Sequence, residues 1–242
     1  MRRETVSAVA EDLLTLVEFL KDARILPSAP GAKVLQHVKR VHFASYSLIL
    51  WKFRLAGIAK HARPFVEEIA SDALQIVPQA LMGYSKTTQL LTRGIIENCL
   101  RHIYFSDHPV EFLKMNRSAK WYLKFEELTD YVATHPDLIA TQKSFKPVDR
   151  LKTLYSDLSG GVHGRRVQDL EMRVALHKIH YEEKSIDARV RDLAKCAESV
   201  NLLLIAFHRQ KFLHFPRPDR QTILRTISPA GRRLLSALPI GN

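Results

Sequence analysis

Two charged residues, Arg93 and Glu97, stand one helical turn apart inside the apolar segment 90–104 of this 242-residue chain. At about 100° per residue, both fall near the stripe of a helix that carries Leu100 and Tyr104, and the segment is apolar on nearly every side. Charged side chains are rarely buried unless they are paired. Two interpretations follow: the charges bridge each other or a neighbouring helix and fix its packing, or they line a cleft and face a ligand.

A second polar group lies in segment 151–166, whose apolar positions form one helical stripe. Ser159 and His163 stand one turn apart at its edge, and three glycines between positions 160 and 164 allow a backbone or a ligand to approach closely. Histidine exchanges protons near neutral pH, and Arg165 and Arg166 add positive charge immediately afterwards. The alternative is a helix C-cap, with the histidine near the negative end of the helix dipole.

The segments that carry these residues, and the rest of the chain, are predicted to be helical. Glycine is scarce, with 9 in the chain, and the alternation typical of strands is missing. Pro64 suits a first helical turn, and Pro78 is expected to kink or end its helix. Helical spacing predicts helices over 5–22, 33–60, 62–82, 85–106, 109–133, 147–160, 167–183, 186–214 and 219–237, with linkers at 27–31, 134–147 and 215–218. The predicted fold class is all-α, a single bundle of about eight to nine helices.

Several large side chains are expected in the core of this bundle. They are Trp51, Phe53, Trp121 and Tyr122. The apolar helix over 186–214 is expected to be a central or dimer-forming helix. His102 extends the polar edge of segment 90–104 and is expected at the surface.

The net charge of +12 and the pI near 9.8 favour a polyanionic partner, either nucleic acid or an anionic membrane surface. Residues 161–242 carry 15 basic and 8 acidic side chains. The end of this region is crowded by Arg217, Arg220, Arg225, Arg232 and Arg233. It is therefore the predicted phosphate-facing surface. The alternative is a solvated basic tail that keeps the protein soluble.

Other classes of protein are excluded by what the sequence lacks. Cys99 and Cys196 cannot build a disulfide scaffold or a multi-cysteine zinc site. His177 and His180 have no accompanying ligand motif, so no metal is expected. The sequence also has no glycine-rich loop of the kind that binds nucleotides, so no cofactor is expected. The longest apolar run, 202–207, is far too short to span a membrane. A soluble cytoplasmic protein without membrane association is expected.

The R-x-x-x-E spacing of Arg93 and Glu97, followed about sixty residues later by a helix ending LYSDLSGGVHG, resembles the HEPN superfamily, the "higher eukaryotes and prokaryotes nucleotide-binding" domains. The resemblance covers roughly residues 84–213. It implies a helical bundle, usually a homodimer, that acts as a metal-independent ribonuclease in phage defence or another mobile-element system. The chain then divides into N-terminal helices at 1–83 that pack on the core, a HEPN-like core at 84–213 and a basic extension at 214–242.

The usual signature of that superfamily is an arginine followed, after four to six residues, by a histidine. Arg101 and His108 fit this spacing by count, although the sequence around His108 is typical of a helix end. His163 has no arginine five to seven residues before it, so Arg93 would have to replace the usual arginine from a different helix.

The resemblance implies roles for these residues in RNA cleavage. His163 would activate the RNA 2′-hydroxyl or protonate the leaving oxygen, and Arg93 would stabilise charge on the phosphate. Glu97 would orient Arg93 or His163, and Ser159 completes the candidate catalytic set. The candidate nucleic-acid-binding residues are Arg101, Arg165, Arg166, Arg217, Arg220, Arg232 and Arg233.

A different class of function remains open beside this one. The chain could be a catalytically inactive helical module that binds nucleic acid or a partner protein through its basic C-terminal third. The missing arginine-to-histidine spacing favours this module, whereas a charged pair inside an apolar stripe favours a site. Salt-sensitive binding without turnover would identify the module.

Overall fold

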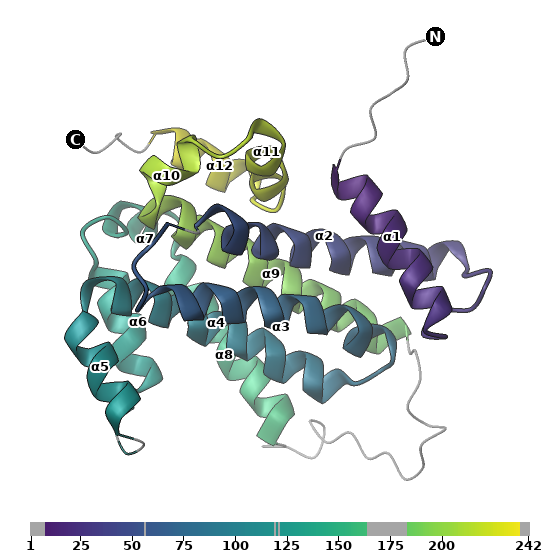
Figure 1. Cartoon of the computed structure of the whole chain (residues 1–242), viewed down its shortest axis with the longest axis horizontal. Helices are drawn as coiled ribbons and strands as arrows, with labels where there is room; N and C mark the ends of the chain where they lie inside the picture. Colours follow the sequence, from purple (N-terminus) through teal and green to yellow (C-terminus); the bar gives the residue numbers. More distant parts are fainter. Residues whose placement is uncertain (1–7, 56, 119, 121, 164–182, 238–242) are drawn as a thin grey trace.

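A computed structural model describes residues 8–55, 57–118, 120, 122–163 and 183–237 of the chain. Throughout these ranges the regular structure is helical, with no strand, which confirms the all-α class (Figure 1). The twelve helices are α1 Ala8–Asp22, α2 Ala32–Arg54, α3 Arg63–Leu81, α4 Ser85–Asp107, α5 Pro109–Arg117, α6 Phe125–Thr134, α7 Ile139–Phe145, α8 Pro147–His163, α9 Glu183–Phe207, α10 Arg209–Leu213, α11 Arg217–Arg225 and α12 Pro229–Ala237.

The helix count exceeds the prediction because predicted helices break in two. The predicted helices over 109–133, 186–214 and 219–237 become α5 and α6, α9 and α10, and α11 and α12, and the predicted linker over 134–147 contains α7. The last of these breaks precedes Pro229, which has no N–H with which to continue α11. The predicted helix over 167–183 lies, except for its last residue, outside the described residues.

Prolines act at the ends of α3. Pro64 stands in its first turn, as predicted, and Pro78 lies in its last turn, three residues before the helix ends at Leu81. Gly83 then adopts a positive φ of 82°, which a residue with a side chain would adopt only with strain. The sharp turn at Gly83 starts α4 alongside α3.

The core of the bundle lies among α2, α3, α4, α8 and α9, which pack against one another. One hydrophobic cluster extends from Leu20 to Leu235, so residues of all three predicted segments share a core. The central position of α9 is confirmed by the buried run 202–206. Within the described ranges, no helix is both long and apolar enough to cross a membrane.

Trp51 is the largest fully buried side chain and joins the C-terminal helices to α2. Its ring contacts Phe212 and Phe215, with ring centroids 5.8 Å and 5.3 Å away. Its Nε1–H donates to Oδ1 of Asn201 at 2.7 Å, and Nδ2 of Asn201 donates to Ser47 at 3.0 Å and to Thr226 at 2.8 Å. This network ties α2 to α9 and to the turn after α11.

Two of the expected core aromatics are exposed, so those predictions were wrong. Phe53 is 62% exposed because it lies two residues, or about 200°, around α2 from the buried Trp51. Tyr122 is 71% exposed, since it lies in the non-helical connection between α5 and α6. Trp121 lies outside the described residues.

Asp72 of α3 is a buried carboxyl that faces the neighbouring helix α4. It is 6% exposed, and Gly94 of α4 leaves room for it, because a Cβ at Gly94 would lie 2.4 Å from Oδ2 of Asp72. Burial, and secondarily the negative charge of Glu68, raise the pKa of Asp72 from 3.8 to about 7. The charged form of Asp72 is therefore unfavourable in the folded protein.

Replacing Asp72 with asparagine is expected to stabilise the protein most at high pH. Between pH 4 and 7 the folded chain binds a proton at Asp72 that the unfolded chain lacks, so this group favours folding more as the pH falls. At pH 8 the variant should exceed wild type in free energy of unfolding by about 2–4 kcal/mol. The difference should shrink toward zero near pH 4. Urea denaturation of both proteins from pH 5 to 8 measures it, and a difference independent of pH would contradict the expectation.

Candidate functional site

Arg93 and Glu97 of α4 meet Tyr155 and His163 of the antiparallel helix α8. Arg93 donates from Nη2 to the Tyr155 hydroxyl at 2.7 Å, and that hydroxyl donates to Oε1 of Glu97 at 2.8 Å. From Nη1, Arg93 also donates to Nε2 of His163 at 3.4 Å. We call these four residues the Arg93 cluster. It brings together three of the four candidate catalytic residues and adds a tyrosine that the sequence analysis did not select.

Tyr155 is held between two groups that cover its ring. The Phe125 ring stacks on it with centroids 3.8 Å apart and an angle of 12° between the planes. The Arg93 guanidinium carbon lies over the ring, 4.5 Å from its centroid. Because Phe125 covers one face of the Tyr155 ring, the guanidinium lies over the other face. Burial raises the pKa of Tyr155, the hydrogen bond from Arg93 opposes this rise, and Glu97 adds to it. The hydroxyl therefore stays protonated and can donate to Glu97.

Charge in the Arg93 cluster is balanced only in part. Glu97 lies 3.8 Å from Arg93 and 3.3 Å from Arg101, so one carboxylate serves two guanidinium groups. The Arg93 side chain is 14% exposed, and its buried Nε has no hydrogen-bond partner among the described residues. The pair thus has the packing contacts expected of a structural ion pair, and two guanidinium groups beside one carboxylate leave a net positive charge.

Ser159, the fourth candidate catalytic residue, does not join the cluster. Its side chain is buried, and its hydroxyl donates to the backbone carbonyl of Tyr155 at 2.7 Å. Helix α8 continues through the glycine pair to His163, three residues beyond the predicted end. A Cβ at Gly161 would lie 2.4 Å from Oε1 of Gln89, so the missing side chain allows α8 to approach α4 closely.

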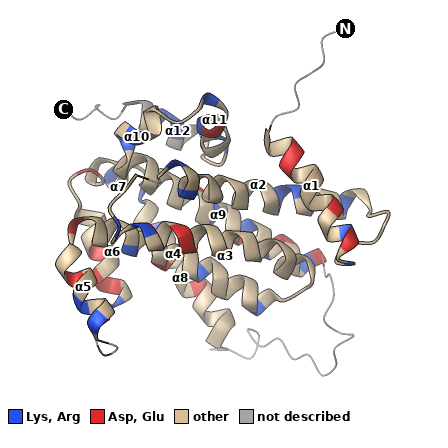
Figure 2. Cartoon of the chain, viewed as in Figure 1, with Lys and Arg blue, Asp and Glu red and all other residues tan. Residues whose placement is uncertain are grey.

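The C-terminal arginines lie away from the Arg93 cluster. In Figure 1, α11 and α12 lie along the edge opposite α8, and Figure 2 shows Lys and Arg recurring over α10–α12. Arg220 donates to the carbonyl of Leu213 at 3.1 Å, and Arg232 donates to that of Ile227 at 2.8 Å. These two side chains therefore hold helix ends, and Arg217, Arg232 and Arg233 are all exposed. Arg165 and Arg166 lie outside the described residues.

His102 is fully buried, contrary to the prediction of a surface position. Its Nδ1 donates to the carbonyl of Ala62 at 2.9 Å, which leaves Nε2 to accept from Nε2 of His208 at 2.7 Å. Burial lowers the pKa of both rings. These neutral histidines lie among the packed side chains of α4 and α9.

Arg101 and His108, whose spacing fits the superfamily signature, have separate partners. Arg101 pairs with Glu97, as described above. His108 stands between α4 and α5, donates from Nδ1 to the carbonyl of Tyr104 at 2.8 Å and stacks on the Tyr104 ring. The helix end expected at His108 is therefore present.

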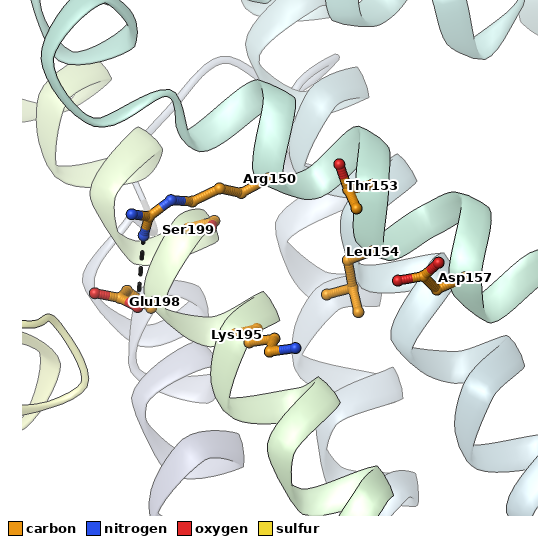
Figure 3. A pocket seen from close by; sticks show the side chains of 7 residues that line it. All are labelled: Arg150, Thr153, Leu154, Asp157, Lys195, Glu198 and Ser199. Atoms are coloured by element: carbon orange, nitrogen blue, oxygen red, sulfur yellow. Dashed lines mark ion pairs between the residues drawn. The ribbon is translucent and has the colours of Figure 1, made fainter.

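A pocket with a volume of about 320 Å³ lies between α8 and α9, apart from the Arg93 cluster (Figure 3). Arg150 and Glu198 form an ion pair of 3.9 Å at one side, and the Lys195 and Asp157 side chains lie at the other. Its two positive and two negative groups give no net attraction for a polyanion. None of the candidate site residues lines it.

The described residues offer no metal site and no reactive thiol. No group of three or more His, Cys, Asp or Glu side chains in this part of the chain is placed to hold a metal ion. Both cysteines are buried, and burial raises the pKa of Cys99 to about 12. Comparisons of the chain with protein-family models, curated proteins and solved structures found no match.

Proposed function

We propose that the chain is a HEPN-like protein that cleaves RNA at the Arg93 cluster. The observation that carries the proposal is the 3.4 Å contact between Nη1 of Arg93 and Nε2 of His163. It places a cationic donor suited to a phosphate beside a ring suited to proton transfer. The net charge of +12 supports an anionic substrate.

In the proposed reaction, His163 takes the proton of an RNA 2′-hydroxyl. The O2′–P bond forms as the P–O5′ bond breaks, and the leaving 5′ oxygen takes a proton from water or from the imidazolium. The products are a 2′,3′-cyclic phosphate and a 5′-hydroxyl. Arg93 stabilises the charge on the phosphate oxygens, and Tyr155 and Glu97 hold the guanidinium in place.

The biological setting rests on the superfamily resemblance. We propose a homodimer that acts in phage defence or another mobile-element system, in the cytoplasm and without a cofactor. Arg101 lies one turn beyond Glu97 on α4 and extends the proposed RNA path away from His163.

The second candidate function is binding of nucleic acid or a partner protein without catalysis. The observation that favours it is the saturation of Glu97, which contacts Arg93, Arg101 and Tyr155. A network of this kind also stabilises the packing of α4 on α8. In this alternative, the basic C-terminal third contacts the partner through its exposed arginines, such as Arg217.

Incubation of the full chain with total bacterial RNA in EDTA tests the proposed function. We expect cleavage that leaves 2′,3′-cyclic phosphate and 5′-hydroxyl ends, and resistance of a substrate whose ribose 2′-hydroxyls are replaced by hydrogen. His163→Ala protein, purified in the same way, controls for contaminating nuclease. Salt-sensitive RNA binding without cleavage would replace the proposed function with the binding module.

A further inference from the structure

A pocket of about 290 Å³ adjoins the Arg93 cluster, because Glu97 and Tyr155 of the cluster also line the pocket. Helix α4, the connection before α6, the start of α6 and helix α8 all contribute to it. Its lining combines three aromatic rings with side chains of both charges: Tyr122, Phe125, Tyr155, Arg101, Lys124, Glu97 and Glu126. Its volume is near the lower end of the range of small-ligand pockets, about 300–1,000 Å³.

The aromatic rings of this pocket differ in what they can still contact. Tyr155 has one face on Phe125 and the other on Arg93, so its ring has no free face. Tyr122 is 71% exposed at the pocket, and no described residue makes a hydrogen bond or ring contact with it. A large aromatic ring left exposed beside a pocket is suited to stacking on a planar ligand.

The charged groups suit the other parts of a nucleotide. Arg101 keeps 35% of its side chain exposed and Lys124 is exposed, so both can reach a phosphate. The Glu126 carboxylate can only accept hydrogen bonds, which suits the amino group of adenine, cytosine or guanine better than uracil. The oxygens of Glu97 already contact Arg93, Arg101 and Tyr155. The Glu126 side chain has no hydrogen-bond or ion-pair partner among the described residues, and its backbone carbonyl accepts from Thr129.

We propose that this pocket binds one unstacked base of an RNA strand, with Tyr122 stacking on the base and Arg101 contacting its phosphate. The inference rests on the proposed function, because it treats the pocket and the Arg93 cluster as parts of one RNA path. Tyr155 and His163 are eight positions apart on α8, and the side chains of both reach the Arg93 guanidinium.

Short RNA analogues that cannot be cleaved test the pocket separately from the chemistry. The probes are fluorescent 2′-O-methyl tetranucleotides, each with one base removed in turn, titrated into the full chain by anisotropy. We expect one position at which loss of the base weakens binding about tenfold, and weaker binding with uracil than with an amino-bearing base there.

A mutant cycle with Tyr122 then assigns that base to the pocket. Tyr122→Ala should weaken binding of the intact tetranucleotide by a similar factor and abolish the effect of removing the base, whereas Tyr122→Phe should keep both. Tyr122 is exposed, so its variants should fold, and thermal denaturation checks this. Arg101→Gln should weaken binding of the intact and the abasic probes equally.

The outcomes separate this inference from the proposed function. Equal losses at all four positions, or an unchanged base effect in Tyr122→Ala, overturn the pocket, even if the wild type cleaves RNA. A Tyr122-dependent base effect in a protein that does not cleave RNA supports the pocket and overturns the ribonuclease. Failure of the wild type to bind any tetranucleotide overturns the base pocket.

Discussion

Replacing His163 with alanine is expected to lower the RNA cleavage rate by about 100-fold or more, because general acid–base catalysis by a positioned side chain contributes about 10²–10⁴-fold. The exposed ring touches Nη1 of Arg93 from the last residue of α8, so its removal leaves no cavity in the core. The free energy of unfolding should change by less than about 0.5 kcal/mol. Single-turnover cleavage of end-labelled RNA measures the rate.

His214→Ala is the matched control for this variant. His214 is also an exposed histidine, and its Nδ1 donates to the carbonyl of Gln210 at 2.7 Å, within its own turn. Its removal should leave the cleavage rate unchanged. RNA affinity, measured at one salt concentration, should stay within about threefold of wild type for His163→Ala, because phosphate contacts by arginine and lysine dominate binding. Cleavage by His163→Ala at the wild-type rate would rule out the proposed catalytic role.

Trp51→Ala is expected to lower the free energy of unfolding by about 3–5 kcal/mol, the usual loss when a large aromatic side chain is deleted from a core. The side chain is fully buried, and its loss leaves a cavity beside Phe212 and Phe215. It also leaves Oδ1 of Asn201 without the indole donor. Guanidinium denaturation followed by far-UV circular dichroism measures the change.

Trp51→Phe separates the two contributions. Phenylalanine keeps most of the apolar packing but cannot donate to Asn201, and a buried unsatisfied acceptor costs about 1–3 kcal/mol. The loss for this variant should therefore lie between zero and that of Trp51→Ala. Equal losses for the two variants would show that the hydrogen bond outweighs the packing.

The juxtaposition of Arg93 and Glu97 could be predicted because both stand on one helix. The helical repeat of about 3.6 residues alone brings side chains four positions apart next to each other. Tyr155 could not be placed the same way. Its contact with them depends on how α8 packs on α4, and that packing is set by close approaches such as Gly161 to Gln89. The apolar stripe containing Tyr155 was the available signal, but a stripe indicates burial and not which neighbour a hydroxyl will reach.

The predictions of burial were wrong where the local sequence was compatible with both a buried and an exposed side chain. Phe53 and His102 show this most clearly, since an aromatic residue was expected inside and a histidine outside. Their positions on α2 and α4 relative to neighbouring helices reversed both expectations. The breaks after α5 and α9 were missed because the spacing of apolar residues there is still compatible with one continuous helix. In the structure, the backbone hydrogen bonds of each helix nevertheless stop at these positions.

The shared core has a consequence for the modularity of this chain. Phe215, Ile223 and Ile227 belong to the same hydrophobic cluster as Trp51, and Thr226 accepts a hydrogen bond from Asn201 of α9. The arginine-rich end is therefore not an appendage that could be exchanged, deleted or grafted onto another protein by itself. A change in its charge can be made by point substitution at exposed positions, whereas a change in its length also alters the interior of the bundle.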